Sequence, residues 1–168
     1  VALLHLSVGL LQKPGNFSLL GGWVPVAQDG STALLDVGQL RSHFAQTPEL
    51  QQALAASDFI FTDEFYLSGY VDMALHPLTP QPITCFSQDP RGFAFWDEPT
   101  TWLGQTALYV TLQSLHGDRD ALVAEFQPYF QTLEPMAEVP LTRGGTVTDT
   151  VLVYQASDMQ QVYEYPYP

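Results

Sequence analysis

Residues 55–75, AASDFIFTDEFYLSGYVDMAL, decide the fold of this 168-residue chain. A short apolar run, FIF at 59–61, lies between Asp58 and Asp63. A run this short, made of a β-branched residue and aromatic residues, predicts a buried strand. From Glu64 onward the apolar residues take the spacing of an amphipathic helix. A buried strand that leads directly into a helix is half of a βαβ unit, so the stretch predicts an α/β fold.

The predicted helix has an apolar stripe and a polar face. The stripe consists of Leu67, Tyr70, Val71, Ala74 and Leu75. Glu64, Ser68 and Asp72 fall on the opposite face. Asp63 stands at the junction of strand and helix, where its carboxylate can cap the first free N–H groups of the helix.

The rest of the chain predicts further helices and strands around this unit. They are helices beginning at Asp36 and Thr47, strands at 83–86 and 107–112, a helix capped by Asp118, and hairpin strands at 136–141 and 147–154. Right-handed crossovers would make the first three strands parallel, and the hairpin would add an antiparallel edge. The predicted fold is an α/β sandwich of two or three layers, with a short, mainly parallel sheet and an antiparallel C-terminal hairpin.

The sequence divides into one domain with two short flanks. Residues 1–14 are an apolar lead-in, either a first helix or the end of a membrane helix, because the apolar run at 1–11 is shorter than the roughly 20 residues that span a bilayer. Residues 15–155 form the single α/β domain. Residues 156–168, rich in proline and tyrosine at their end, are expected to be a loosely held tail.

Composition excludes some partners and some kinds of site. Five Lys and Arg stand against 18 Asp and Glu, which gives a net charge of −13. Such a chain repels phosphate backbones and anionic membrane surfaces, so nucleic acid is not an expected partner. Cys85 is the single cysteine, so no disulfide forms within the chain, and its apolar setting predicts a buried, inert thiol. The four histidines are scattered, so their spacing predicts no metal site.

Ligands of open α/β sheets bind beyond the carboxyl ends of the strands, and five residues are candidates there: Asp63, Glu64, Asp89, Arg91 and Trp96. Asp63 and Glu64 could be a pair of carboxylates that serves acid–base chemistry or binds a hard cation. The alternative is that they simply stabilise the helix N-terminus. Arg91 either binds an anion or pairs with a neighbouring acid such as Asp89. Trp96 belongs to an aromatic loop that either stacks on a sugar or lipid or forms a small secondary core. No serine lies in a nucleophile elbow, so no catalytic residue is predicted.

Several motifs occur in an order that resembles a known family. They are Gly22-Trp23, the stretch 58–75, RGFAFW at 91–96, ALYV at 107–110, MAEVPLTRGG at 136–145 and VLVY at 151–154. Together they resemble the extracytoplasmic C-terminal domain of bacterial glycosyltransferase family 39 proteins, over roughly residues 15–154. These are polytopic membrane enzymes related to protein O-mannosyltransferases and to the aminoarabinose transferase of lipid A. The chain departs from the family in its Val-Pro and Gly-rich insert after Trp23 and in lacking a Gln-Tyr-Asp in the loop after Arg91.

The resemblance implies an accessory role. Family members use polyprenyl- or dolichyl-phosphate sugars, and their catalytic acid lies in a loop between the first membrane helices, to which nothing here corresponds. The chain would then be a non-catalytic domain at the periplasmic or extracellular face, tethered to the inner membrane through the transmembrane region of its parent protein. It would meet the lipid-linked donor and the acceptor only indirectly and hold no cofactor, although the parent could use a divalent metal. The alternatives are an independent periplasmic module that binds a carbohydrate or a cation, and a small hydrolase.

Overall fold

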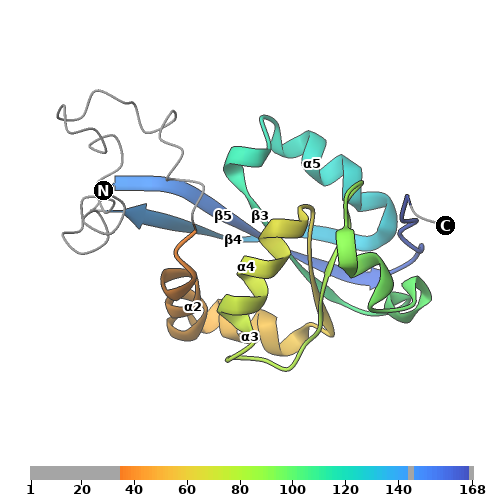
Figure 1. Cartoon of the computed structure of the whole chain (residues 1–168), viewed down its shortest axis with the longest axis horizontal. Helices are drawn as coiled ribbons and strands as arrows, with labels where there is room; N and C mark the ends of the chain where they lie inside the picture. The colour runs from red at the N-terminus through yellow and green to blue at the C-terminus, as the bar shows by residue number, and fades with distance from the viewer. Residues whose placement is uncertain (1–34, 144–145, 167–168) are drawn as a thin grey trace.

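A five-stranded sheet with the order β2-β1-β3-β5-β4 runs through the protein (Figure 1). The computed structural model describes residues 35–143 and 146–166. Its strands are β1 (Phe59–Thr62), β2 (Ile83–Cys85), β3 (Ala107–Leu112), β4 (Phe130–Arg143) and β5 (Thr146–Met159). The lead-in at 1–14, the Gly-Trp at 22–23 and the hairpin residues 144–145 lie outside the described residues.

The pairing of the strands agrees with the predicted topology. β1 pairs in parallel with both β2 and β3, so the first three strands are parallel. β5 then pairs antiparallel with β3 and with β4, which leaves β4 at the edge. Pro135 and Pro140 lie in this edge strand, where a residue without an N–H is tolerated. The predicted α/β fold with an antiparallel C-terminal hairpin is confirmed.

Helices cover both faces of the sheet, so the protein has three layers (Figure 1). Three helices pack on one face: α2 (Val37–Gln46), α3 (Pro48–Ala56) and α4 (Phe65–Leu75). The other face is covered by α5 (Arg119–Phe126), with short 3₁₀ turns that include η4 (Arg91–Phe95), η5 (Pro99–Trp102), η6 (Gln113–Leu115) and η7 (Gln127–Tyr129). None of the helices formed by residues 35–143 and 146–166 has the length and apolar content needed to cross a membrane.

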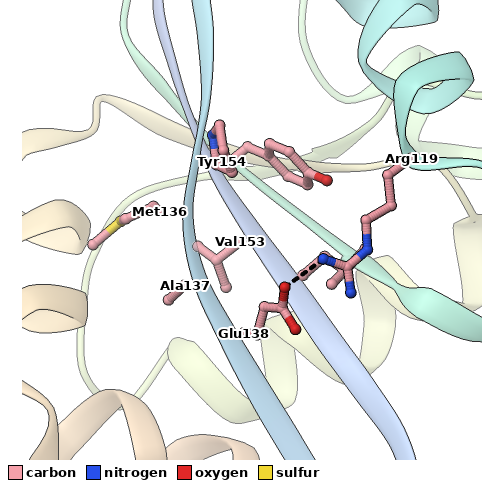
Figure 2. Close-up of a pocket in the computed structure, with 8 residues that line it drawn as sticks. Arg119, Met136, Ala137, Glu138, Val153 and Tyr154 are labelled. Atoms are coloured by element: carbon pink, nitrogen blue, oxygen red, sulfur yellow. Dashed lines mark hydrogen bonds and ion pairs between the residues drawn. The ribbon is translucent and has the colours of Figure 1, made fainter.

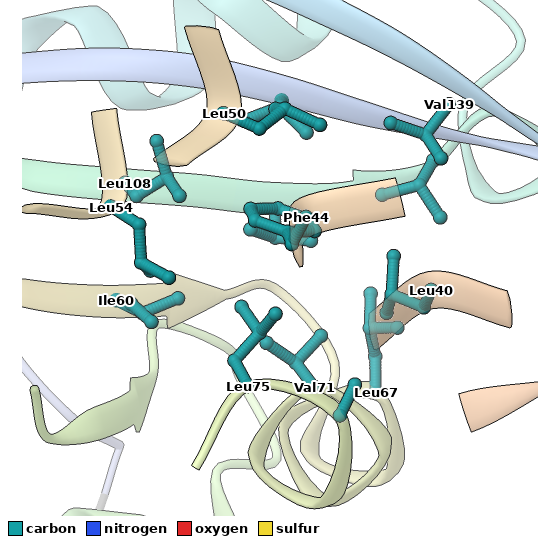
Figure 3. Packing of buried hydrophobic residues seen from close by; sticks show 14 of the residues in the cluster. Leu40, Phe44, Leu50, Leu54, Ile60, Leu67, Val71, Leu75, Leu108 and Val139 are labelled. Carbon is teal, nitrogen blue, oxygen red and sulfur yellow. The ribbon is translucent and has the colours of Figure 1, made fainter. Parts of the chain in front are cut away.

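Alternation along the strands sorts the core into two chemically different halves. Ile60 and Leu108 point toward α2, α3 and α4, into a cluster that is mainly aliphatic and surrounds Phe44 (Figure 3). Phe61 and Tyr109 point to the opposite face, where aromatic rings predominate. Successive side chains of a strand point to opposite faces, so one strand supplies both halves. We call these halves the aliphatic layer and the aromatic layer.

The predicted helix caps at Asp36 and Asp118 are confirmed. The Asp36 carboxylate accepts a hydrogen bond from Gln39 N at 2.9 Å, and Asp118 accepts one from Asp120 N at 2.9 Å. The side chain of Gln39 reaches Thr142 of β4, where its Oε1 accepts from the backbone N–H at 2.6 Å. This contact joins α2 to the far end of the hairpin.

Three expectations were wrong. Ser68 was assigned to the polar face of its helix, but it is buried, because its hydroxyl pairs with Thr62 Oγ1 at 2.6 Å. The hairpin strands are much longer than predicted, because residues on both sides of the β-rich runs continue the ladder. The segment 156–168 was expected to be loosely held, but β5 continues to Met159 and Tyr163 is buried, with its ring stacked 4.8 Å from that of Phe86.

Candidate functional site

A cluster of polar side chains lies where β1 and β3 end. The two strands are parallel, with Phe61 opposite Tyr109, so Asp63, which follows β1, lies beside the last residues of β3. The hydroxyl of Tyr109 donates to Asp63 Oδ2 at 2.9 Å, and that of Thr111 donates to Asp63 Oδ1 at 2.8 Å. His116 follows the 3₁₀ turn η6 after β3 and places Nε2 2.6 Å from Asp63 Oδ2. We call these four residues the Asp63 cluster.

Burial and charge explain the protonation of the Asp63 cluster. The side chains of Asp63 and His116 are 9% and 18% exposed. The hydrogen bond to Asp63 raises the pKa of His116, against the opposing effect of burial. Burial and then the charge of Asp63 raise the pKa of Tyr109 well above its ordinary value, so the phenol stays protonated and continues to donate. The neutral hydroxyls of Tyr109 and Thr111 and the imidazole of His116 therefore hold the Asp63 carboxylate. The carboxylate in turn favours the charged form of the imidazole.

The expected helix cap at Asp63 is wrong. Glu64 occupies the N-cap position of α4, and its side chain makes no capping hydrogen bond. Tyr109 and Thr111 are two residues apart on β3, so both hydroxyls lie on the face toward which Asp63 points. Two donors on that face, together with His116, attract the carboxylate away from the helix and toward β3.

The structure brings most of the sequence-predicted site residues to one rim. The pKa of Glu64 is raised by burial first and then by the charges of Asp63 and Asp89, so both carboxylates lie near that of Glu64. Arg91 donates from Nε to both oxygens of Asp89, at 2.8 and 2.9 Å, as the pairing interpretation predicted. Its guanidinium also lies 4.4 Å from the centre of the Phe65 ring, a cation–π contact.

Trp96 directly follows the 3₁₀ turn η4. Its ring packs against Phe93, with 4.5 Å between centroids, and its side chain is largely exposed. Tyr109, Thr111 and His116 were not among the sequence candidates. A tyrosine and a threonine two positions apart at the end of a buried strand, followed closely by a histidine, would have been the available signal.

A second polar group lies at the same end of the sheet, on the aliphatic side. Thr62 and Ser68 share the 2.6 Å hydrogen bond between their hydroxyls and are both buried. Cys85 is buried beside them, and burial raises the pKa of its thiol to about 11. Within the described ranges, no group of three or more His, Cys, Asp or Glu side chains is placed to hold a metal ion.

A small hollow of about 210 Å³ lies on the hairpin, beneath α5 (Figure 2). Arg119 of α5 reaches across it and donates to Glu138 of β4, while Tyr154 of β5 forms part of its wall. This ion pair raises the pKa of Arg119 and lowers the pKa of Glu138. The charge of the arginine is already matched, so the hollow offers little attraction to an anionic ligand.

The chemistry of the Asp63 cluster favours a structural role. His116 can hold and release one proton, but the hydroxyls of Tyr109 and Thr111 beside it both donate to Asp63. A phenol with a raised pKa is also a weak nucleophile. The cluster therefore ties β1, β3 and the turn η6 together.

Comparison of this chain with protein-family models, with curated proteins and with solved structures found no match. Its function is therefore inferred from its own residues and from the resemblance that they carry.

Proposed function

We propose that this chain is a non-catalytic extracytoplasmic accessory domain of a polytopic membrane glycosyltransferase that uses lipid-phosphate-linked sugar donors. One observation carries the non-catalytic part of the proposal: both carboxylate oxygens of Asp63 are engaged by side chains of the domain itself. The order of motifs that resembles glycosyltransferase family 39 supports the kind of parent protein. The net charge of −13 adds support, because it would repel an anionic lipid-phosphate donor from this domain.

Exposed aromatic side chains support an accessory role. Phe95 and Trp96, in and beside η4, are 71% and 67% exposed, and Leu103 in the same loop region is exposed as well. Exposed apolar groups gathered in one region often mark a surface that a partner covers. Tryptophan is also enriched where proteins meet the membrane–water interface. The partner in this proposal is the transmembrane region of the parent protein.

The test compares the isolated chain with the parent protein. The purified chain, assayed with polyprenyl-phosphate sugar donors with and without a divalent metal, should transfer no sugar. In the parent protein, replacing Phe95 and Trp96 together by serine should lower transfer without changing the stability of the domain. Met73→Ser is the matched control, since Met73 is equally exposed but lies on α4. Turnover by the isolated chain that Asp63→Asn abolishes would overturn the proposal.

An independent periplasmic binding module is the second candidate. The observation that favours it is the raised pKa of Glu64 beside Asp63 and Asp89, because neighbouring carboxylates could share a cation or accept from sugar hydroxyls. The reading frame upstream of Val1 separates the two candidates. Several apolar spans of about 20 residues are expected there for the accessory domain, and their absence would favour the binding module.

A further inference from the structure

A hollow of about 470 Å³ opens on the aromatic side of the protein, between the C-terminal segment and the turns η4 and η5 (Figure 1). Ala94, Phe95, Glu98 and Pro99 line it from the turns, and residues 162–165 line it from the C-terminal segment. Its size is within the range of pockets that hold small molecules, roughly 300–1,000 Å³. None of these residues belongs to the Asp63 cluster, so the hollow is a separate place to look for a ligand.

The core holds both walls of the hollow in place. Trp102, the last residue of η5, is buried, with its ring stacked 4.5 Å from that of Phe59 in β1. Tyr163 of the C-terminal segment is buried as well, and the hydroxyls of Tyr165 and Thr84 share a hydrogen bond of 3.1 Å. A ligand would therefore meet walls that are already ordered, which lowers the entropic cost of binding.

Aromatic rings form much of the wall. Phe95, Tyr163 and Tyr165 line the hollow, and the rings of the two tyrosines lie 5.5 Å apart between centroids, inclined at 68° to each other. Burial raises the pKa of Tyr163 to about 12 and also raises that of Tyr165, so both phenols stay neutral. The faces of aromatic rings carry negative partial charge, so such a wall attracts cations.

Two carboxylates lie in the same wall. Glu98 and Glu164 both line the hollow and are both exposed, so a ligand can reach them. Among residues 35–143 and 146–166, neither side chain has an ion-pair or hydrogen-bond partner. The whole chain has five Lys and Arg against 18 Asp and Glu, so it supplies few cations that could pair with them. A cationic ligand would supply the charge that the chain lacks.

The charges around the hollow have the same sign. The charge of Asp97 adds to the raised pKa of Tyr165, and that of Glu125 adds to the raised pKa of Tyr163, so both carboxylates act on the wall. No Lys, Arg or His is among the described residues that line the hollow. An anionic ligand would therefore be repelled both by the wall and by the net charge of −13.

The lining also selects the kind of cation. Ca²⁺ and Mg²⁺ need several oxygen ligands at close range, whereas this wall sets its two carboxylates among rings and the apolar side chains of Ala94, Pro99 and Val162. An alkylated ammonium is weakly hydrated, so it can rest on rings and apolar groups while it stays near carboxylates. Aromatic side chains commonly recognise quaternary ammonium ligands in this way.

We propose that this hollow binds a small organic cation, an alkylated ammonium whose charge is offset by Glu98 and Glu164 and whose alkyl groups pack on the rings of Phe95 and Tyr165. The proposal goes beyond the accessory role described above and does not rest on it. The hollow shares Phe95 with the surface that is proposed to meet the transmembrane region, but the two proposals are tested by different measurements. Ligand binding to the isolated chain decides this one, and sugar transfer by the parent protein decides the other.

The experiment uses two matched probes, choline and 3,3-dimethylbutan-1-ol, which have the same shape and the same hydroxyl and differ in charge. Titration of the full 168-residue chain with choline at constant ionic strength, followed by backbone amide NMR, should give saturable shifts at Ala94, Val162 and Glu164. Choline should bind about three- to thirtyfold more tightly than the alcohol, which is the range of a cation–π contact. Equal binding of the two probes, shifts that do not saturate, or shifts that lie elsewhere would each overturn the proposal.

Variants that remove one charge test the carboxylates. Glu98→Gln and Glu164→Gln should each weaken choline binding about two- to fivefold, the range of an exposed ion pair, and leave binding of the alcohol unchanged. Glu49→Gln is the matched control, since Glu49 is also exposed and its replacement changes the net charge equally, but it lies on α3, on the other face of the sheet. An equal loss in Glu49→Gln would show that choline follows the net charge rather than the hollow, and would overturn the proposal.

A pair of variants at Tyr165 tests the aromatic wall. Tyr165→Phe keeps the ring and loses only the hydroxyl that pairs with Thr84, so it should bind choline as the parent chain does. Tyr165→Leu keeps an apolar side chain and removes the ring, so the preference for choline over the alcohol should fall at least about threefold. An unchanged preference in Tyr165→Leu would overturn the assignment of an aromatic cation site.

Discussion

The two faces of the sheet are filled by different chemistry, although the same strands supply both. The aliphatic layer packs leucine, valine and isoleucine under three helices. The aromatic layer joins Phe61 to its neighbours by ring contacts, with centroids 4.5 Å from Tyr109, 4.8 Å from Phe86 and 5.5 Å from Phe130. Rings cover more area per residue, so one short helix, α5, with the 3₁₀ turns and Tyr163 covers a face that has three α-helices on the other side.

The polar groups at the strand ends also differ between the two faces of the sheet. On the aliphatic side Thr62 and Ser68 are uncharged, fully buried and paired with each other. On the aromatic side Asp63 and His116 form a pair that is ionic when His116 is protonated and that keeps a little contact with solvent. Uncharged hydroxyls can be buried when one hydrogen bond satisfies them, whereas a charge needs several partners or some water. The depth at which each group is buried therefore follows from its desolvation cost.

The largest effect is expected from truncating the centre of the aromatic layer. Phe61→Ala should lower the free energy of unfolding by about 4 kcal/mol, because it removes a fully buried ring and leaves a cavity. Ile60→Ala, the adjacent residue on the aliphatic side, should cost about 3 kcal/mol. Urea denaturation of both variants measures the difference. An equal or larger loss at Ile60 would contradict the view that ring contacts make the aromatic layer the more sensitive half.

The next largest effect is expected in the Asp63 cluster. Asp63→Ala should cost about 3 kcal/mol, because the buried hydroxyls of Tyr109 and Thr111 lose their acceptor. Asp63→Asn keeps an acceptor oxygen and loses only the charge, so about 1 kcal/mol is expected. Asp89→Asn, in a pair that is half exposed, should change stability by less than about 0.5 kcal/mol. A loss at Asp63→Ala no larger than at Asp89→Asn would show that the cluster does not tie the strands together.

A smaller effect is expected from pH. The folded pKa of His116 is raised above the unfolded value of about 6.5, so its contribution is complete below pH 6.5 and is lost as pH rises through the folded pKa. For one proton, the free energy of unfolding cannot change by more than about 1.4 kcal/mol per pH unit. The raised pKa of Glu64 acts with the same sign in a lower window, which begins near its unfolded value of about 4.3.

Unfolding free energies between pH 5.5 and 9 test this expectation. His116→Gln should flatten the profile above pH 6.5. His76→Gln should leave the pH profile unchanged, since the His76 side chain is 77% exposed and its ring lies as far as 3.8 Å from the Asp72 carboxylate. NMR titration of the imidazole protons gives the pKa of His116 directly, and a value at or below 6.5 would remove the basis of the prediction.

The smallest effect is expected at Cys85, on the aliphatic side. Burial raises the pKa of its thiol to about 11, so roughly one molecule in a thousand carries the reactive thiolate at pH 8. A thiol reagent should therefore label the native protein far more slowly than the urea-unfolded protein, measured by absorbance. Labelling at the same rate in both states would show that Cys85 is accessible and that this end of the aliphatic layer is open.

Local patterns predicted much of the fold. The strand at 107–112 was predicted with the observed bounds, and the caps at Asp36 and Asp118 were both correct. The predicted hairpin strands were too short because their outer parts mix polar residues and proline with apolar ones and show no clear alternation, whereas the pairing of β4 with β5 continues through them. The buried Tyr163 was missed because a tail rich in proline and tyrosine gives no periodic signal, and its ring is held by Phe86 of a distant segment.

The sequence placed Asp63, Glu64, Asp89 and Arg91 beyond the strand ends as candidate ligand residues. In the structure Arg91 pairs with Asp89, and the charges of Asp63 and Asp89 act on Glu64, while a ligand role for these residues stays a prediction. The sequence did not indicate that His116 would join Asp63. The pairing of Asp89 with Arg91 was accessible because the two residues are neighbours in the chain.

Local sequence patterns were enough to predict the strands, the helices and the α/β sandwich, because periodicity, caps and breakers act within a few residues. The partner of each polar side chain, in contrast, depends on residues that only the folded chain brings together. Asp63 lies 46 and 48 residues from the two hydroxyls that donate to it, and the parallel pairing of β1 with β3 brings those donors to the end of β1.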